Sequence, residues 1–144
     1  ADIDARWKTD YTGDAAGSNI WTRIIWGIGS IDWVVTNPPF NEATQILPLA
    51  WEYAEVGMAM LLRITYAEPC NDPKRVRSYR GDWLGANADQ LRYFIPISPR
   101  PRFRSDGRGS DSATVAWFVW DKRHSWAKLG VDCPFKFITD WRAQ

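Results

Sequence analysis

The stretch from Asp32 to Phe40, Asp-Trp-Val-Val-Thr-Asn-Pro-Pro-Phe, constrains the fold and the chemistry of this chain more than any other. Its first half is the short apolar run of a buried strand, and the run stops where two prolines follow Asn37. Proline cannot donate to a sheet ladder, and it holds the residue before it in an extended conformation. We therefore predict a strand over residues 31–36, with Asn37 presented just beyond its end.

The turn Asn37-Pro38-Pro39-Phe40 predicts a site for a planar group that carries an amino group. The Asn37 side-chain oxygen and the Pro38 carbonyl can accept its two hydrogens, and the Phe40 ring can stack on its face. Accepting both hydrogens favours a pyramidal nitrogen whose lone pair is no longer delocalised into the ring. No general base is then needed before attack, so a cofactor must bring the electrophile. The alternative is a simple Asn-Pro-Pro turn without chemistry.

Hydrophobic periodicity predicts two helices and a second strand around this first strand. They are a short helix over residues 18–27, a longer one over 42–56 that contains Pro48 and ends at Gly57, and a buried strand over 57–64. A strand, a helix and a second strand joined in this way predict a parallel pair.

The second half of the chain predicts an antiparallel hairpin with a long tip. Its strands are the extended runs 90–97 and 114–120, a polar helix precedes them over 74–84, and an edge strand follows near 135–138. We expect Trp117 and Trp120 to pack in the core or at the sheet edge. At 144 residues, the chain is expected to form one α/β domain.

Composition excludes several kinds of site. Cys70, Cys133 and the single histidine, His124, fit no metal-ligand spacing and no Ser-His-Asp triad. We predict no metal cofactor. No apolar run reaches the length of a membrane span and no signal peptide is visible, so no membrane partner is expected.

The charge is unevenly distributed along the chain. Residues 1–71 carry 4 basic and 9 acidic side chains, whereas residues 72–108 carry 9 basic and 4 acidic ones. Arginines interleaved with an aromatic residue suit phosphate contacts beside a stacking platform. The hairpin tip therefore predicts a nucleic-acid surface, which three arginines of the preceding helix could extend; the alternative is a solvated loop. The tip residues are Arg100, Arg102, Phe103, Arg104 and Arg108, and the helix residues are Arg75, Arg77 and Arg80.

The stretch Asp32–Phe40 resembles the catalytic motif of S-adenosylmethionine-dependent amino methyltransferases. The chain is further similar to adenine-specific DNA methyltransferases of phage and prophage type, from residue 1 to about residue 121. The segments that carry this similarity are Leu61-Leu62-Arg63 with Glu68-Pro69, Pro99-Arg100-Pro101-Arg102-Phe103, Asp106-Gly107-Arg108-Gly109 and Ala116-Trp117-Phe118-Val119-Trp120-Asp121.

The resemblance implies methyl transfer from S-adenosylmethionine to the N6 amino group of adenine in DNA, with the base flipped out of the duplex. Asn37, Pro38, Pro39 and Phe40 would hold this base. Asp2 resembles the acid that binds the cofactor ribose, and Asp10, with Tyr11 beside it, resembles the acid that contacts the cofactor adenine. Without the resemblance, Asp2 is a solvated terminal acid and Asp10 a turn residue.

The resemblance also implies a partial Rossmann-like sheet, mostly parallel, with an antiparallel C-terminal hairpin. In that family a strand and a Gly-rich loop precede the acidic strand end, whereas this sequence begins at Ala1. We expect residues 1–144 to be one truncated catalytic domain. The absent strand would lie beside the strand that carries Asn37 and leave that strand with a hydrophobic edge. Three interpretations stay open: a fragment, self-association through this edge, or a chain that has lost cofactor binding.

Two other functions are consistent with the same residues. The amino group could belong to an RNA guanine or a protein glutamine, because the motif serves those substrates too. The chain could also be a non-catalytic nucleic-acid-binding module derived from a methyltransferase. For the DNA methyltransferase, we expect a cytoplasmic, DNA-associated protein in a bacterial or phage-infected cell.

Overall fold

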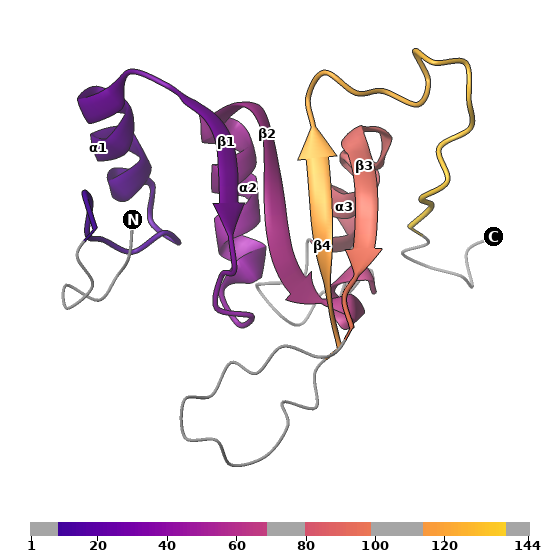
Figure 1. The fold of residues 1–144 in the computed structure, drawn as a ribbon, viewed down its shortest axis with the longest axis horizontal. Helices are drawn as coiled ribbons and strands as arrows, with labels where there is room; N and C mark the ends of the chain where they lie inside the picture. Colours follow the sequence, from indigo (N-terminus) through magenta and orange to yellow (C-terminus); the bar gives the residue numbers. More distant parts are fainter. Residues whose placement is uncertain (1–8, 69–79, 99–113, 138–144) are drawn as a thin grey trace.

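The computed structural model describes residues 9–68, 80–98 and 114–137, which form an α/β fold around one four-stranded sheet (Figure 1). The strands lie in the order β1-β2-β4-β3, with β1 parallel to β2 and β4 antiparallel to both of its neighbours. The α/β class, the parallel pair and the hairpin are thereby confirmed. In chain order the elements are α1 (Ser18–Ile28), β1 (Ile31–Thr36), α2 (Ala43–Tyr53), β2 (Ala54–Arg63), η1 (Ile64–Ala67), α3 (Arg80–Ala86), η2 (Ala88–Gln90), β3 (Leu91–Pro96) and β4 (Val115–Asp121).

The sheet is mixed, so the expectation of mostly parallel pairing is wrong. Three strands run in the same direction, but β4 lies between β2 and β3, and only the β1–β2 pairing is parallel. Periodicity predicts that a hairpin forms, but it does not specify which of its strands docks against the rest of the sheet. Here the second strand of the hairpin takes the inner place.

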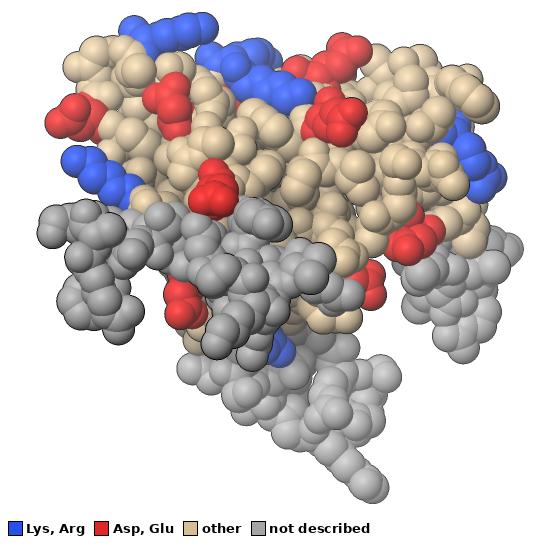
Figure 2. All heavy atoms as spheres, turned by 180° about the vertical axis from the view of Figure 1, so that it is seen from behind, with Lys and Arg blue, Asp and Glu red and all other residues tan. Residues whose placement is uncertain are grey.

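The core lies between the sheet and the helices α2 and α3, which both cover the same face (Figure 1). Alternate side chains of β2 and β4 point toward these helices, as the two-residue period of a strand requires. The buried residues of this layer include Leu47, Ala50, Met58, Met60, Leu62, Leu84, Phe118 and Trp120. Seen from the helical side, basic and acidic side chains of the described residues are interspersed (Figure 2).

Two predicted boundaries differ from the structure. Helix α2 ends at Tyr53 and β2 begins at Ala54, so Gly57 lies inside the strand and does not end the helix. The helix runs through the exposed Pro48.

The predicted edge strand near 135–138 does not form in its described part, because residues 122–137 contain no strand. Phe135 and Phe137 instead pack against the core.

Gly57 lets β1 and β4 approach β2 closely. A Cβ atom at this position would lie 2.8 Å from the Trp33 ring of β1. It would also meet the Trp120 carbonyl oxygen of β4, a backbone atom that cannot move aside. This close approach explains why a residue that breaks most strands is placed in the middle of this one.

We expect Gly57→Ala to lower the free energy of unfolding by about 1–3 kcal/mol, the usual cost of overpacking. Gly85→Ala is the matched control, because nothing lies within 4 Å of its Cβ position and alanine favours a helix. Urea denaturation followed by circular dichroism would compare the two. Equal stability of both variants would contradict the close packing of the three strands.

Asp121 is the one buried charged residue among the described side chains, with 2% of it exposed. Its carboxylate accepts hydrogen bonds from Arg123 Nε at 3.1 Å, from the Arg123 backbone N–H at 3.0 Å and from Arg92 Nη1 at 3.0 Å. The Arg123 side chain is the main reason that the pKa of Asp121 lies below its usual value, although burial acts in the opposite direction.

The lowered pKa of Asp121 predicts a pH-dependent contribution to stability. A carboxyl group whose pKa is lower in the folded state stabilises the fold above its unfolded pKa of about 3.9, and this contribution is lost as pH falls through the folded pKa. At pH 7 we expect Asp121→Asn to cost about 1.5–3 kcal/mol, the range of charge-assisted hydrogen bonds. The difference from the unmodified chain should shrink below about pH 4. The exposed Asp132→Asn is the control, and a difference that persists unchanged in acid would refute the role of the charge.

Candidate functional site

The Asn-Pro-Pro-Phe turn lies at the carboxyl end of β1, which is an edge strand of the described sheet. Pro38 is buried and anchors the turn, whereas Asn37 is exposed and Phe40 is half-buried. The Pro39 carbonyl accepts hydrogen bonds from the backbone N–H groups of Glu42 and Ala43, at 2.9 and 3.0 Å. The turn therefore runs directly into α2, and the first turn of that helix fixes its shape.

The two acceptors assigned to the amino group are not engaged by the rest of the fold. In residues 9–68, 80–98 and 114–137, no hydrogen bond involves the Asn37 carboxamide or the Pro38 carbonyl. Only the Pro39 carbonyl is used internally. An acceptor that faces solvent or a cleft without a protein partner is free to bind a ligand donor.

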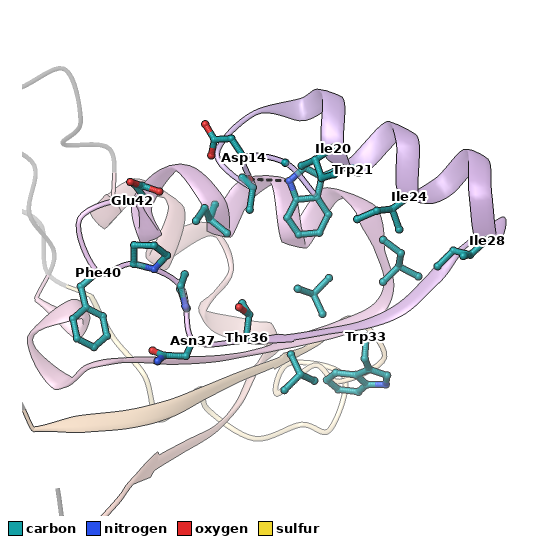
Figure 3. A pocket seen from close by; sticks show the side chains of 18 residues that line it. Asp14, Ile20, Trp21, Ile24, Ile28, Trp33, Thr36, Asn37, Phe40 and Glu42 are labelled. Carbon is teal, nitrogen blue, oxygen red and sulfur yellow. Dashed lines mark hydrogen bonds between the residues drawn. The ribbon is translucent and has the colours of Figure 1, made fainter. Parts of the chain in front are cut away.

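Asn37 and Pro38 line a cleft of about 640 Å³ that runs between α1 and the edge of β1 (Figure 3). Its volume is in the range of about 300–1,000 Å³ that small-molecule sites occupy. The walls are apolar along most of the cleft, and polar side chains gather at the end near Asn37. Residues that line it include Asp14, Ile20, Trp21, Ile24, Ile31, Val34, Thr36, Asn37, Pro38, Phe40 and Glu42.

Helix α1 supplies the apolar wall opposite β1. Its isoleucines repeat at helical spacing, and Figure 3 shows Ile20, Ile24 and Ile28 on the side of the helix that faces the strand. The Trp21 indole N–H donates to the Ala15 carbonyl at 2.9 Å, which fixes the ring at the inner end of this wall. Ile20 is buried in the core and Ile24 packs against it, whereas Ile28 is 58% exposed, so the stripe passes from the core to the open end of the cleft.

The polar end of the cleft carries two carboxylates, Asp14 and Glu42, which lie on the same side of the turn (Figure 3). The Asp14 carboxylate accepts the backbone N–H of Ala16 at 2.8 Å and so closes the loop before α1. Glu42 is the residue before the first turn of α2, and its side chain makes no capping hydrogen bond. Carboxylates here favour a cationic or hydroxyl-bearing ligand group next to Asn37.

None of the residues predicted to bind the cofactor is found in the lining of this cleft. Asp2 lies outside the described residues. Asp10 is exposed, and Tyr11 is half-buried with its hydroxyl against the backbone of α1 at Gly27. Neither Asp10 nor Tyr11 lines the cleft that Asn37 opens onto.

The predicted nucleic-acid surface lies outside the described residues, together with Arg75 and Arg77. Its five residues are Arg100, Arg102, Phe103, Arg104 and Arg108. The strands that carry this tip, β3 and β4, form the expected hairpin. The role of the tip in nucleic-acid binding stays a prediction.

Self-association through the edge of β1 also stays a prediction. The Val35 side chain on that strand is 65% exposed.

Sequence reasoning missed a contact beside the motif. The Arg63 guanidinium lies over the Phe40 ring, 4.9 Å from its centre. Arg63 ends β2 and Phe40 follows β1, and the carboxyl ends of two parallel strands meet at the same edge of a sheet. That rule, applied to both predicted strands, is the signal that could have placed the two residues together.

No family model, curated protein or solved structure matches this chain. Within the described ranges, no three His, Cys, Asp or Glu residues are grouped to hold a metal ion. The same residues include no helix long and apolar enough to cross a membrane. The candidate function therefore depends on the geometry of the turn and the cleft.

Proposed function

We propose that this protein transfers a methyl group from S-adenosylmethionine to the N6 amino group of an adenine in DNA. The observation that supports the proposal most is the pair of unengaged acceptors, Asn37 and Pro38, at the mouth of a cleft of small-molecule size. A four-stranded mixed sheet is compatible with part of a Rossmann-like fold, in which ligands bind beyond the carboxyl ends of the strands.

The chemistry assigned to the turn needs two acceptors and an aromatic surface. The adenine amino group would donate one hydrogen to the Asn37 side-chain oxygen and one to the Pro38 carbonyl. Its nitrogen lone pair would then form a bond to the methyl carbon as the carbon–sulfur bond of the donor breaks, which leaves a neutral thioether, and the nitrogen would lose a proton to solvent. The rate gain comes from positioning and from fixed dipoles, since no histidine lines the site.

The described residues suit part of the methyl donor. Trp21 and Ile24 offer an apolar wall for its adenosyl ring, and the carboxylates of Asp14 and Glu42 suit its cationic groups. When bound, S-adenosylmethionine supplies an activated methyl group on sulfur. The chain's own contribution is to hold the adenine and to exclude water along the apolar wall.

A second candidate function is a nucleic-acid-binding module without catalysis. The observation that favours it is the position of Asp10 and Tyr11, which the resemblance assigns to the cofactor but which do not line the cleft. Such a module would still bind an adenine at Asn37 and Phe40. The two functions differ in whether the chain binds S-adenosylmethionine.

Product analysis tests the proposal. The protein is incubated with S-adenosylmethionine and, separately, with adenine-containing DNA, RNA and a glutamine-containing protein, and the methylated product is identified by mass spectrometry. We expect N6-methyladenine in DNA. Methylation of only guanine or only glutamine would show that adenine in DNA is not the substrate and would assign that other amino group in its place. Absence of any product, with no S-adenosylmethionine binding by calorimetry but adenine-dependent DNA binding, would establish the binding module instead.

A further inference from the structure

A second pocket, of about 470 Å³, is lined by Phe40 and by residues at and beyond the carboxyl end of β2. Phe40 lines both this pocket and the cleft, so the ring is a wall shared by two adjacent spaces. The second pocket is small and mostly polar. Its lining residues are Phe40, Asn41, Arg63, Thr65, Tyr66 and Arg80.

The fold places two guanidinium groups in this pocket by different routes. Arg63 is the last residue of β2, and its guanidinium lies over the Phe40 ring. Arg80 is the first residue of α3, and its guanidinium lies 4.9 Å from the centre of the Tyr66 ring. Planar guanidinium groups stack on aromatic rings in this way and keep their N–H edges available.

The positive charge of the pocket is not neutralised by the described part of the chain. Neither Arg63 nor Arg80 forms an ion pair with a described carboxylate. Arg80 Nη2 donates to the Glu68 carbonyl at 2.6 Å, which is a neutral acceptor, and the buried Arg80 Nε has no hydrogen-bond partner. Neither guanidinium group therefore has an anionic partner among the described residues, and a phosphate in the pocket would supply one.

Tyr66 adds no negative charge. It is buried, and this burial is the main cause that raises the pKa of its hydroxyl, against a smaller lowering by its hydrogen bond with Thr44. The hydroxyl is therefore neutral at physiological pH. With Thr65 and Asn41 it lines the pocket with neutral polar groups beside the two cations.

We propose that this pocket binds a backbone phosphate of the same nucleotide whose base is held at Asn37 and Phe40. This inference rests on the proposed function. A guanidinium fork matches phosphate oxygens in geometry and charge. In a nucleotide, the phosphate is joined to the base through one sugar, and Phe40 lines both the cleft proposed for the base and the pocket proposed for the phosphate. The pocket would thus favour a nucleotide over a protein glutamine, which carries no anion beside its amide.

The test uses short single-stranded oligothymidylates with one central adenine. In a second oligonucleotide, a neutral methylphosphonate replaces one phosphate flanking the adenine, on the 5′ or the 3′ side. In a third, the adenine is replaced by an abasic site. Fluorescence anisotropy gives the affinity of each for the protein, and no cofactor is needed.

We expect one of the two methylphosphonates to weaken binding by about tenfold or more, as loss of a charge-assisted hydrogen bond should. In Arg63→Gln, an exposed position whose replacement should leave the fold intact, the phosphate and methylphosphonate oligonucleotides should bind equally. Arg80→Gln should behave in the same way. Arg23→Gln on α1 removes the same charge from another exposed position and should keep the tenfold difference.

The outcomes separate this inference from the proposed function. Equal binding of phosphate and methylphosphonate by the unmodified chain, or a full difference in Arg63→Gln, overturns the phosphate pocket. If adenine is still preferred over the abasic site in that case, the adenine site stands without it. Conversely, a phosphate preference without an adenine preference overturns the adenine site and, with it, the link between this phosphate and a bound adenine, while the pocket itself still binds phosphate. Binding of none of the oligonucleotides overturns both sites.

Discussion

The Asn37→Ala variant is expected to lose methyl transfer to adenine by at least about a hundredfold, the effect of removing one preorganised polar group from a reacting site. The carboxamide supplies one of the two acceptors for the amino hydrogens, and the Pro38 carbonyl alone cannot hold both. Because Asn37 is exposed and makes no hydrogen bond with a described residue, the thermal midpoint should stay unchanged. The rate is measured as N6-methyladenine formed per unit time.

Asn19→Ala is the matched control for this substitution. Asn19 is exposed in the first turn of α1 and does not line the cleft, so its loss should leave the rate unchanged. A binding assay adds a readout that needs no turnover. The unmodified chain should prefer adenine over a purine that lacks the amino group, and Asn37→Ala should not. Full activity or a retained preference in Asn37→Ala would remove the role of the turn.

The strands and the turn could be predicted because their signals are local. The run that ends at Thr36 is apolar and stops at two prolines, and the hairpin strands are long extended runs. The start of β2 could not be placed, because Gly57 reads as a helix end in sequence. A glycine is required at position 57 because of tertiary packing: the Trp33 ring and the Trp120 carbonyl leave no room for a Cβ atom.

The candidate site could likewise be predicted only where its signal is local. The Asn37–Phe40 turn follows from the sequence, since prolines fix its backbone wherever it lies. The contacts of Arg63 with Phe40 and of Arg80 with Tyr66 do not, because each joins elements that meet only when the sheet forms. The cleft likewise depends on where α1 lies against β1, and a helical stripe shows only that one face is apolar.

Trp120→Ala is expected to lower the free energy of unfolding by about 3–5 kcal/mol, the usual cost of emptying a buried aromatic site. Trp120 is fully buried, stacked on Phe118 at 5.7 Å and edge-on to Trp83 at 5.3 Å. For a domain whose total stability is about 5–15 kcal/mol, this is a large share. Trp26→Ala is the control, since Trp26 is 83% exposed and should change stability by less than about 0.5 kcal/mol.

Trp120→Phe separates packing from base recognition. The buried indole N–H of Trp120 has no hydrogen-bond partner, so phenylalanine keeps most of the apolar contact and removes an unsatisfied donor. We therefore expect Trp120→Phe to cost much less than Trp120→Ala and to bind the adenine oligonucleotide as the unmodified chain does. Urea denaturation and anisotropy measure the two properties. A folded Trp120→Phe variant that no longer binds would show that this tryptophan reads the base, because packing alone predicts no such loss.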